Sequence, residues 1–382
     1  MKELIIIFLN LFAYWRMLDY EYIIDDQLVP QRKWKNPLKT FWMQLNARAY
    51  SNRRVEHLQR IAVHAAVAVF IYKAFGSTQA SFAAALLFSI NPVNLNGVAW
   101  MNGIGYSMCA LLTLLMVYCP LLAPLAYIYS LFWHVTAFNA PAVMMFSSPE
   151  MLLLYPVIIG IAYLAKFKIP FGKVQGNATL SHRWGSVKSK RFKSMSFGKF
   201  VFIVKTYFYY FTLALWPMKL GLFPTFGYGY GVTMTETAIT ERPTLNFVGG
   251  LALLGTNIWL MIHFIGTPIS YGLFFWHVMI APFLNFVILQ QTITDRYTYL
   301  ANIGLMYALC GAFYMTPYGN TLVALAFGIY YCKLHLFLPA YENMTQYIDY
   351  NLHDWPDSFA AWNYKVVLHQ DKGYVFSAIY HW

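Results

Sequence analysis

The sequence predicts an all-α polytopic membrane protein with about eleven transmembrane helices. The chain has 382 residues, of which 59% are hydrophobic, 19% aromatic and only 11% charged. A soluble domain is nearer half apolar and a quarter charged, so this chain has too few charges to cover a water-facing surface. Its apolar runs extend over roughly 15 to 25 residues, which is close to the length that a helix needs to cross a bilayer.

Eleven apolar runs are expected to form the spans, and prolines interrupt or end several of them. The expected spans are residues 4–18, 58–75, 79–91, 104–119, 121–146, 151–165, 200–216, 246–265, 268–290, 300–315 and 320–338. The first run has no small-residue cleavage site and leads directly into YWRMLDYEY, so it is predicted to be a span and not a signal peptide. We therefore expect a transmembrane domain over residues 1–338 and a helical tail over residues 339–382.

The distribution of basic residues predicts the orientation of these spans. Nine Lys or Arg and no acid lie between Lys166 and Lys199. Loops of this kind stay in the cytoplasm, so the N-terminus is predicted to be cytoplasmic and the C-terminus exoplasmic. Anionic lipid heads account for the net charge of +12, and nucleic acid is not expected as a partner. The first outer loop, residues 19–57, also carries seven Lys or Arg, which runs against the rule.

Four polar stretches that are far apart in the sequence fall at the outer membrane face on this map. They are IIDDQ, NPVNLNGVAWMNG, SSPEM and ITDRYTY. Polar groups that gather at one face are typical of a site in a membrane protein. No phosphate-loop, dinucleotide or zinc signature occurs, and the four cysteines show no paired spacing. A channel or transporter is disfavoured, because the spans carry few charges and no evident inverted repeat.

Read together, these stretches resemble the transmembrane and tetratricopeptide-repeat O-mannosyltransferases and their bacterial relatives, which are GT-C glycosyltransferases. The likeness runs from about Tyr20 to the C-terminus. The family's acidic pair after the first span is matched in YEYIIDDQLV. Its R-P-L-x6-L-N pattern is mostly kept in NPLKTFWMQLN, and its H-x-x-N/A-x5-Y pattern at the beginning of a span resembles HAAVAVFIY. SPEMLLLYP resembles S-K-E-x5-P, and DRYTYLANIG matches D/E-R-Y-x-Y-L-P-x-x-G apart from its proline. The segment from Trp355 to Trp382 resembles one tetratricopeptide repeat, which is too few for a peptide-binding array.

The chain departs from the family pattern at its centre. Where the family has H-P-x-H-x-E, this chain has three asparagines, namely Asn91, Asn94 and Asn96. The G-R-x-D element that follows in the family is absent, Asn36 replaces an arginine, and Pro149 replaces a lysine. Each change exchanges an ionisable group for a neutral one, so the fold is expected to survive them more easily than the activity.

The resemblance implies that a carboxylate in the first outer loop takes the proton from the acceptor hydroxyl. Asp25 and Asp26 are the candidates, and the sequence does not rank them. A divalent metal, Mg²⁺ or Mn²⁺, held by the same pair is the alternative means of activating the hydroxyl. A solvated loop pair without a function is the competing interpretation. Glu150 is a third candidate catalytic carboxylate, although an acid at the start of a helix also complements the helix dipole.

Arg296 is the candidate for binding the phosphate of a polyprenyl-phosphate or dolichyl-phosphate sugar, because a guanidinium binds phosphate with two parallel hydrogen bonds. Arg53 and Arg54 are expected to assist it. The competing interpretation is an interfacial anchor in which Arg296 pairs with Asp295. Further residues are expected to orient these groups or contact the acceptor: Asp295, Tyr297, Asn91, Asn94, Tyr228 and Tyr230.

Two functions follow from this sequence. The first is a glycosyltransferase that moves one sugar from a polyprenyl-phosphate donor to a protein Ser or Thr hydroxyl, with mannose the sugar that the resemblance implies. The second is a non-catalytic membrane subunit or scaffold of a larger complex. The protein is expected in the bacterial cytoplasmic membrane or the endoplasmic reticulum membrane, among membrane lipids and complex partners.

Overall fold

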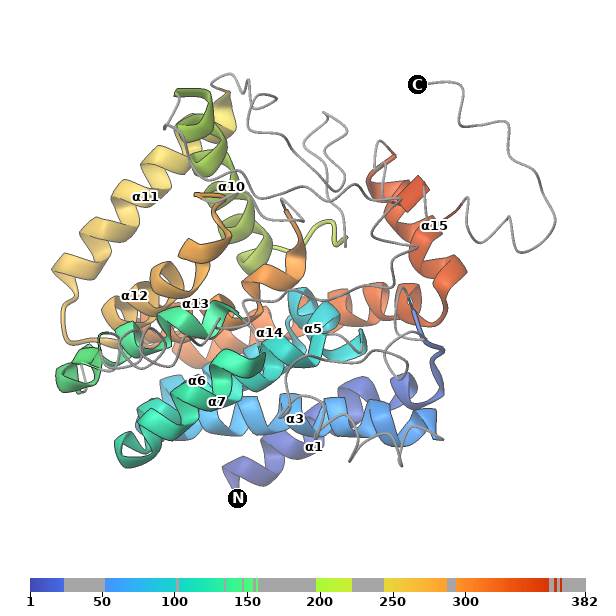
Figure 1. Cartoon of the computed structure of the whole chain (residues 1–382), viewed down its shortest axis with the longest axis horizontal. Helices are drawn as coiled ribbons and strands as arrows, with labels where there is room; N and C mark the ends of the chain where they lie inside the picture. Colours follow the sequence, from blue (N-terminus) through green and yellow to red (C-terminus); the bar gives the residue numbers. More distant parts are fainter. Residues whose placement is uncertain are drawn as a thin grey trace.

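The structure is a computed structural model that describes residues 1–23, 52–100, 103–133, 135–145, 148–153, 156, 197–221, 244–286, 293–356, 361–362 and 365. Throughout these residues the regular elements are helices, as the sequence predicts, and no strand occurs among them. The chain therefore has the all-α class expected of it. Figure 1 shows the helices gathered into one body, with α10 and α11 at one side and α15 at another.

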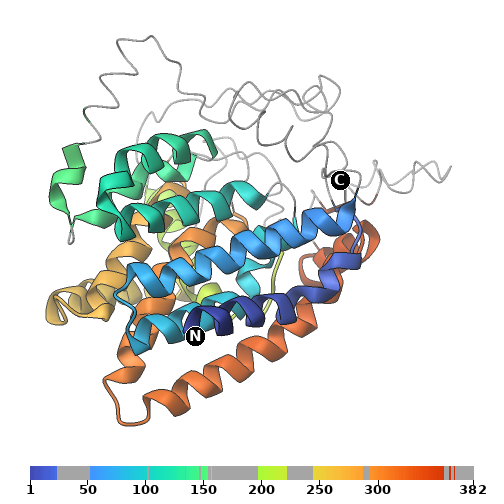
Figure 2. The same cartoon turned by 90° about the horizontal axis from the view of Figure 1, so that it is seen from below.

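The first half of the described chain builds a stack of neighbouring helices. Its elements are α1 (Lys2–Tyr14), η1 (Trp15–Asp19), α3 (Arg53–Ala74), α4 (Gln79–Ile90), η3 (Pro92–Asn94), α5 (Leu95–Ala99), α6 (Ile104–Tyr118), η5 (Pro120–Leu122), α7 (Ala123–Trp133), η6 (Val135–Met144) and η7 (Pro149–Leu153). Helix α3 packs against α1, α4 and α6, and α6 packs against α7. Figure 2 shows α1, α3, α6 and α7 following one another in this order.

The second half supplies α10 (Phe197–Leu215), α11 (Leu245–His263), α12 (Pro268–Ile280), η9 (Ala281–Phe283), η10 (Asp295–Thr298), α13 (Tyr299–Tyr314), α14 (Gly319–Phe337), η11 (Leu338–Tyr341) and α15 (Met344–Asp354). Helix α13 lies between α12 and α4, and α14 packs against α4. Helix α10 packs against α11. The predicted boundary between domain and tail, at residue 338, falls where α14 continues into η11.

Local sequence explains where several helices begin and end. Asn52, Thr78 and Asn343 each accept a hydrogen bond from a backbone N–H of the first turn that follows. The turn between α3 and α4 contains Gly76 with a φ of 83°, a left-handed conformation that glycine adopts without steric cost.

A sharp bend of 57° separates α4 from the short helices η3 and α5. Pro92 causes it, because proline has no N–H to donate and disfavours the helical conformation at the residue before it. Asn91 accordingly has an extended conformation, with φ −65° and ψ 119°, and its side chain accepts a hydrogen bond from the N–H of Val93. The bend turns the polar segment after residue 90 into the protein.

The eleven predicted spans are not supported by the described residues. Two helices there, Leu245–His263 and Gly319–Tyr341, are long and apolar enough to cross a membrane, and a third span results if the bent α4–α5 pair counts as one. Other predicted spans are shorter helices, such as Ile104–Tyr118 and Pro268–Phe283. Prolines divide the run over 121–146, and most of the run over 151–165 lies outside the described residues.

Two glycines set the distance between α12 and α13. A side-chain carbon added at Gly304 would clash with the carbonyl oxygen of Gly272 and lie 2.8 Å from the backbone nitrogen of Trp276. Neither neighbour is a flexible side chain, so the helices would have to separate. Small residues that let helix backbones approach closely are typical of helix pairs in membranes.

Replacing Gly304 by alanine is therefore expected to destabilise the protein by about 1–3 kcal/mol, the usual cost of overpacking. Gly255→Ala on α11 is the matched control, because nothing lies within 4 Å of the added carbon there. We expect the control to leave stability unchanged or to raise it by up to about 1 kcal/mol. Thermal unfolding of the purified variants in detergent checks this, and equal melting temperatures for both would show that α12 and α13 are not in this close contact.

Candidate functional site

The segment from Asp295 to Thr298 forms the short helix η10 and leads directly into α13. All four of its side chains are buried. The hydroxyl of Thr298 donates to the carbonyl oxygen of Asp295 at 2.6 Å and closes the turn. An aspartate and an arginine are thus placed side by side in the interior of the protein, at the start of a helix that the sequence predicts to begin at the outer face.

Asp295 is fully buried and bonds to two donors from a different part of the chain. The Tyr209 hydroxyl donates to its Oδ1 at 2.9 Å, and the N–H of Gly221 donates to its Oδ2. Burial raises the pKa of this carboxyl to about 7, and the two hydrogen bonds oppose part of that rise. Asp295 therefore holds the end of the α10 segment against η10.

Arg296 does not pair with Asp295. Its side chain is only 6% exposed, and its Nε donates to the Tyr106 hydroxyl at 3.3 Å. The guanidinium carbon lies 4.5 Å from the centre of the Trp100 ring and 5.7 Å from that of Tyr297. No carboxylate of the described residues lies within ion-pair distance of Arg296, and its buried Nη1 has no hydrogen-bond partner.

This arrangement has a direct chemical consequence. Taking a cation out of water is costly unless an anion or several acceptors compensate it. Aromatic faces attract a guanidinium, by about 0.5–2 kcal/mol, but they leave its N–H groups unsatisfied. The Arg296 guanidinium is therefore suited to bind an anion that brings its own acceptor oxygens, such as a phosphate group.

The asparagines of the central motif lie next to this site, but their side chains form hydrogen bonds within the protein. Element η10 contacts both η3 and α5. The Asn91 amide nitrogen donates to Ala214 O at 2.9 Å, and that of Asn94 donates to Phe88 O at 2.7 Å. The Oδ1 of Asn94 accepts from Asn302 at 3.3 Å. These amides hold the bend after α4 in place.

The C-terminal helix α15 covers the same end of the protein. The Tyr350 hydroxyl accepts from the backbone N–H of Leu220 at 3.3 Å, and the Trp355 ring meets that of Tyr209 edge to face at 6.4 Å. The Tyr341 hydroxyl in η11 donates to Oδ1 of Asn96 at 3.0 Å. Residues near Asp295 are thereby enclosed by a segment that the sequence assigns to the tail.

Other predicted site residues are not brought to Arg296 by any contact of the described residues. Arg54 is exposed and forms an ion pair with Asp19, with 2.7 Å between Nη2 and Oδ1. Arg53 is half-buried beside it, in the first turn of α3. Glu150 is exposed in η7. Their roles in binding and catalysis stay predictions.

Asp25, Asp26, Tyr228 and Tyr230 lie outside the described residues. The metal alternative rests on the first two and stays a prediction for that reason. In the part of the chain that the structure describes, no group of three or more His, Cys, Asp or Glu side chains is placed to hold a metal ion.

Sequence reasoning missed Trp100, Tyr106 and Gly221, which surround the two charges of η10. Trp100 and Tyr106 belong to the quoted polar stretch and its continuation, so aromatic residues near a motif were the available signal. The predicted first outer loop, residues 19–57, also ends differently, because Glu56 and His57 at its end are buried.

The chain was also compared with known proteins. No protein-family model, no curated protein and no solved structure matches it. The resemblance to the O-mannosyltransferases therefore rests on the quoted motifs alone.

Proposed function

We propose that the protein is a membrane glycosyltransferase that moves a single sugar, mannose by the resemblance, from a polyprenyl-phosphate donor to a protein Ser or Thr hydroxyl. The observation that carries the proposal is the Arg296 guanidinium. It is buried, stacked on Trp100 and without a carboxylate partner in the described residues. A structural anchor would be expected to pair with a carboxylate, and Arg296 pairs with no carboxylate of the described residues.

In this proposal Arg296 binds the phosphate that leaves when the sugar is transferred. Negative charge grows on that phosphate in the transition state, and a fixed cation in a site of low dielectric stabilises it without having to reorganise. The Nη1 group supplies an N–H that no described residue uses. Asp25 or Asp26 is the proposed base for the acceptor hydroxyl, with Glu150 the third candidate, as the resemblance implies.

The test is sugar transfer by purified protein from a panel of polyprenyl-phosphate and dolichyl-phosphate sugars to Ser- and Thr-containing peptides. We expect turnover with at least one donor, and we expect Asp25→Asn or Asp26→Asn to abolish it while donor binding persists. Donor binding without turnover, across the whole panel, would contradict the catalytic proposal.

A specific observation favours the second candidate, a non-catalytic scaffold. Asn91 and Asn94 replace ionisable residues of the family pattern, and their amides are taken up by bonds to Ala214, Phe88 and Asn302. Asparagine side chains with such hydrogen bonds stabilise the fold and do not transfer protons in a reaction. Under this proposal the protein binds lipid phosphate at Arg296 and assembles with other membrane proteins.

We further propose that the complete chain has a GT-C-like arrangement of eleven spans, in which short apolar helices join across their breaks. Residues 166–199 are then cytoplasmic and residues 339–382 exoplasmic. A cysteine introduced at Lys190, after replacement of the four native cysteines, is expected to react with a membrane-impermeant maleimide only from the cytoplasmic side. Labelling from the outer side of intact cells or sealed vesicles would contradict the proposed orientation.

A further inference from the structure

A pocket lies at the end of the bundle away from Arg296. It has a volume of about 470 Å³ and is lined from the end of α3, the end of α6, the turn between α11 and α12, and the sides of α12 and α13. Helix α6 carries Tyr106 near its start and Val117 near its end. At a rise of 1.5 Å per residue, these positions are about 16 Å apart along the axis. The pocket is therefore separate from the site around Arg296.

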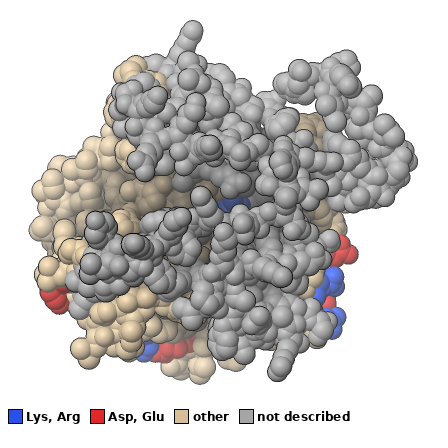
Figure 3. All heavy atoms as spheres, in the orientation of Figure 1, with Lys and Arg blue, Asp and Glu red and all other residues tan. Residues whose placement is uncertain are grey.

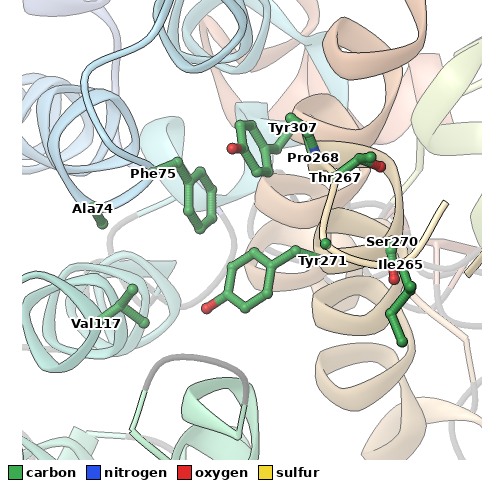
Figure 4. A pocket seen from close by; sticks show the side chains of 10 residues that line it. Ala74, Phe75, Val117, Ile265, Thr267, Pro268, Ser270, Tyr271 and Tyr307 are labelled. Carbon is green, nitrogen blue, oxygen red and sulfur yellow. The ribbon is translucent and has the colours of Figure 1, made fainter.

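Apolar and aromatic side chains make up most of the lining of this pocket, together with the hydroxyl groups of Thr267, Ser270, Tyr271 and Tyr307 (Figure 4). Phe75 stacks on Tyr307 with 4.2 Å between ring centres. The hydroxyls of Thr267, Ser270 and Tyr271 donate to the carbonyl oxygens of residues 264, 261 and 143, at 2.7–2.8 Å. Because three of the four lining hydroxyls donate within the protein and no charged side chain lines the pocket, its chemistry fits a mainly apolar ligand.

The mouth of the pocket adjoins exposed apolar side chains of α11 and of the turn that follows it. Ile265 lines the pocket and is 72% exposed, and Ile262, one turn earlier on α11, is similarly exposed. Helix α11 is one of the helices able to span a membrane, and only 11% of its apolar window is buried in the protein. Figure 3 shows a described surface with few charged side chains on the face it displays. With α11 as a membrane span, a molecule that enters past Ile265 comes from the bilayer.

Charge at this end of the bundle identifies the kind of lipid. Lys73 directly precedes the lining residues Ala74 and Phe75 and is paired with Glu3. The Lys2 ammonium lies 5.6 Å from the ring centre of Tyr72, and the described chain shows no carboxylate in contact with it. Glu3 compensates Lys73, so Lys2 and Lys73 together leave one positive charge close to the end of α3, and this charge matches a phosphate head joined to a hydrocarbon chain.

We propose that this pocket binds one acyl chain of a membrane phospholipid whose phosphate lies near Lys2 and Lys73. The volume is within the roughly 300–1,000 Å³ of ligand pockets, and burial of methylene groups stabilises the chain in it. The site does not depend on the proposed transferase activity, because it shares no residue with the environment of Arg296.

The experiment uses the full chain, purified in a mild detergent or in nanodiscs. Phosphatidylglycerol with a diazirine in its acyl chain is photolysed with the protein, and the adducts are mapped by peptide mass spectrometry. We expect adducts in the peptides that contain Phe75 and Ile265–Tyr271. Native mass spectrometry of the same preparation is expected to show one retained phospholipid per chain.

A filling variant gives the second measurement. Val117→Trp places a large ring in the pocket and is expected to reduce the retained lipid and the adducts more than about tenfold, the equivalent of two lost methylene contacts. Val248→Trp is the matched control, because Val248 is an exposed residue of α11, and it should retain the lipid.

Three outcomes would overturn the proposal. The first is the absence of adducts in the pocket peptides of the wild-type protein. The second is a folded Val117→Trp variant that retains as much lipid as its control. The third is labelling by a diazirine polyprenyl phosphate that excess phosphatidylglycerol does not reduce, which would assign the pocket to the tail of an isoprenoid lipid. Since none of these readouts involves sugar transfer, an inactive transferase would leave the result interpretable.

Discussion

Replacing Arg296 by alanine is expected to lower sugar transfer by roughly 10- to 150-fold while the protein remains folded. A hydrogen bond to a charged group contributes about 1.5–3 kcal/mol, and this range corresponds to that loss of rate. Arg296→Lys is expected to recover only part of the activity, because an ammonium lacks the planar fork of a guanidinium and its stacking on Trp100. The measurement is the initial rate of transfer from a polyprenyl-phosphate sugar, normalised to folded protein.

Arg16→Ala is the matched control for this experiment. Arg16 is an exposed arginine in η1 whose guanidinium lies near the Trp15 ring, so the control removes a charge and an aromatic contact of the same kind. We expect wild-type rates from it. Full activity of Arg296→Lys, or a loss that follows the amount of folded protein and not the rate, would show that Arg296 only anchors the fold.

The second large effect is expected at Asp295, whose contribution to the stability of the protein should fall as the pH rises from about 4 to about 7. Burial raises the pKa of Asp295 to about 7 in the folded chain, whereas an unfolded aspartate has a pKa near 3.9. Between these values the folded chain binds more protons than the unfolded chain, so raising the pH favours unfolding. The contribution of this one group is at most about 4 kcal/mol.

Asp295→Asn is expected to remove this pH dependence, because an amide does not titrate in that range. Asp295→Ala is expected to be less stable than Asp295→Asn by about 1–3 kcal/mol, since it removes the carboxyl group that accepts from the buried N–H of Gly221 and from the hydroxyl of Tyr209. Melting temperatures between pH 4 and pH 8 provide the measurement. Glu342→Gln, at an exposed carboxylate, is the control and should keep the wild-type slope. An unchanged slope in Asp295→Asn would mean that another group causes the pH dependence.

The sequence predicted those helices that are determined by nearby residues. The apolar runs over 246–265 and 320–338 became α11 and α14, because length and composition alone decide a helix of that kind. Pro92 ended α4 where a proline must end a helix, and α13 began at Tyr299, close to its expected start. The number of spans was not predicted correctly, because an apolar run can be divided by prolines and by the packing of neighbouring helices.

The partners of the two central charges could not be predicted in this way. The sequence suggests that Asp295 pairs with its neighbour Arg296, but the partners of Asp295 are Tyr209 and Gly221, more than 70 positions away. Arg296 bonds to Tyr106, almost 200 positions away. Such contacts are set by tertiary packing, and periodicity along the chain carries no information about them. The burial of Glu56 and His57, in a segment that looks like a basic outer loop, has the same origin.

A cryo-electron microscopy structure of the protein with bound polyprenyl phosphate tests most directly whether Arg296 binds the phosphate of a membrane lipid. We expect phosphate density within hydrogen-bond distance, about 2.7–2.9 Å, of the Arg296 guanidinium, with the guanidinium still in contact with the Trp100 ring. The density should be absent from the Arg296→Ala variant prepared in the same way. Phosphate bound elsewhere on the protein, with Arg296 turned to a carboxylate of the chain, would contradict this expectation.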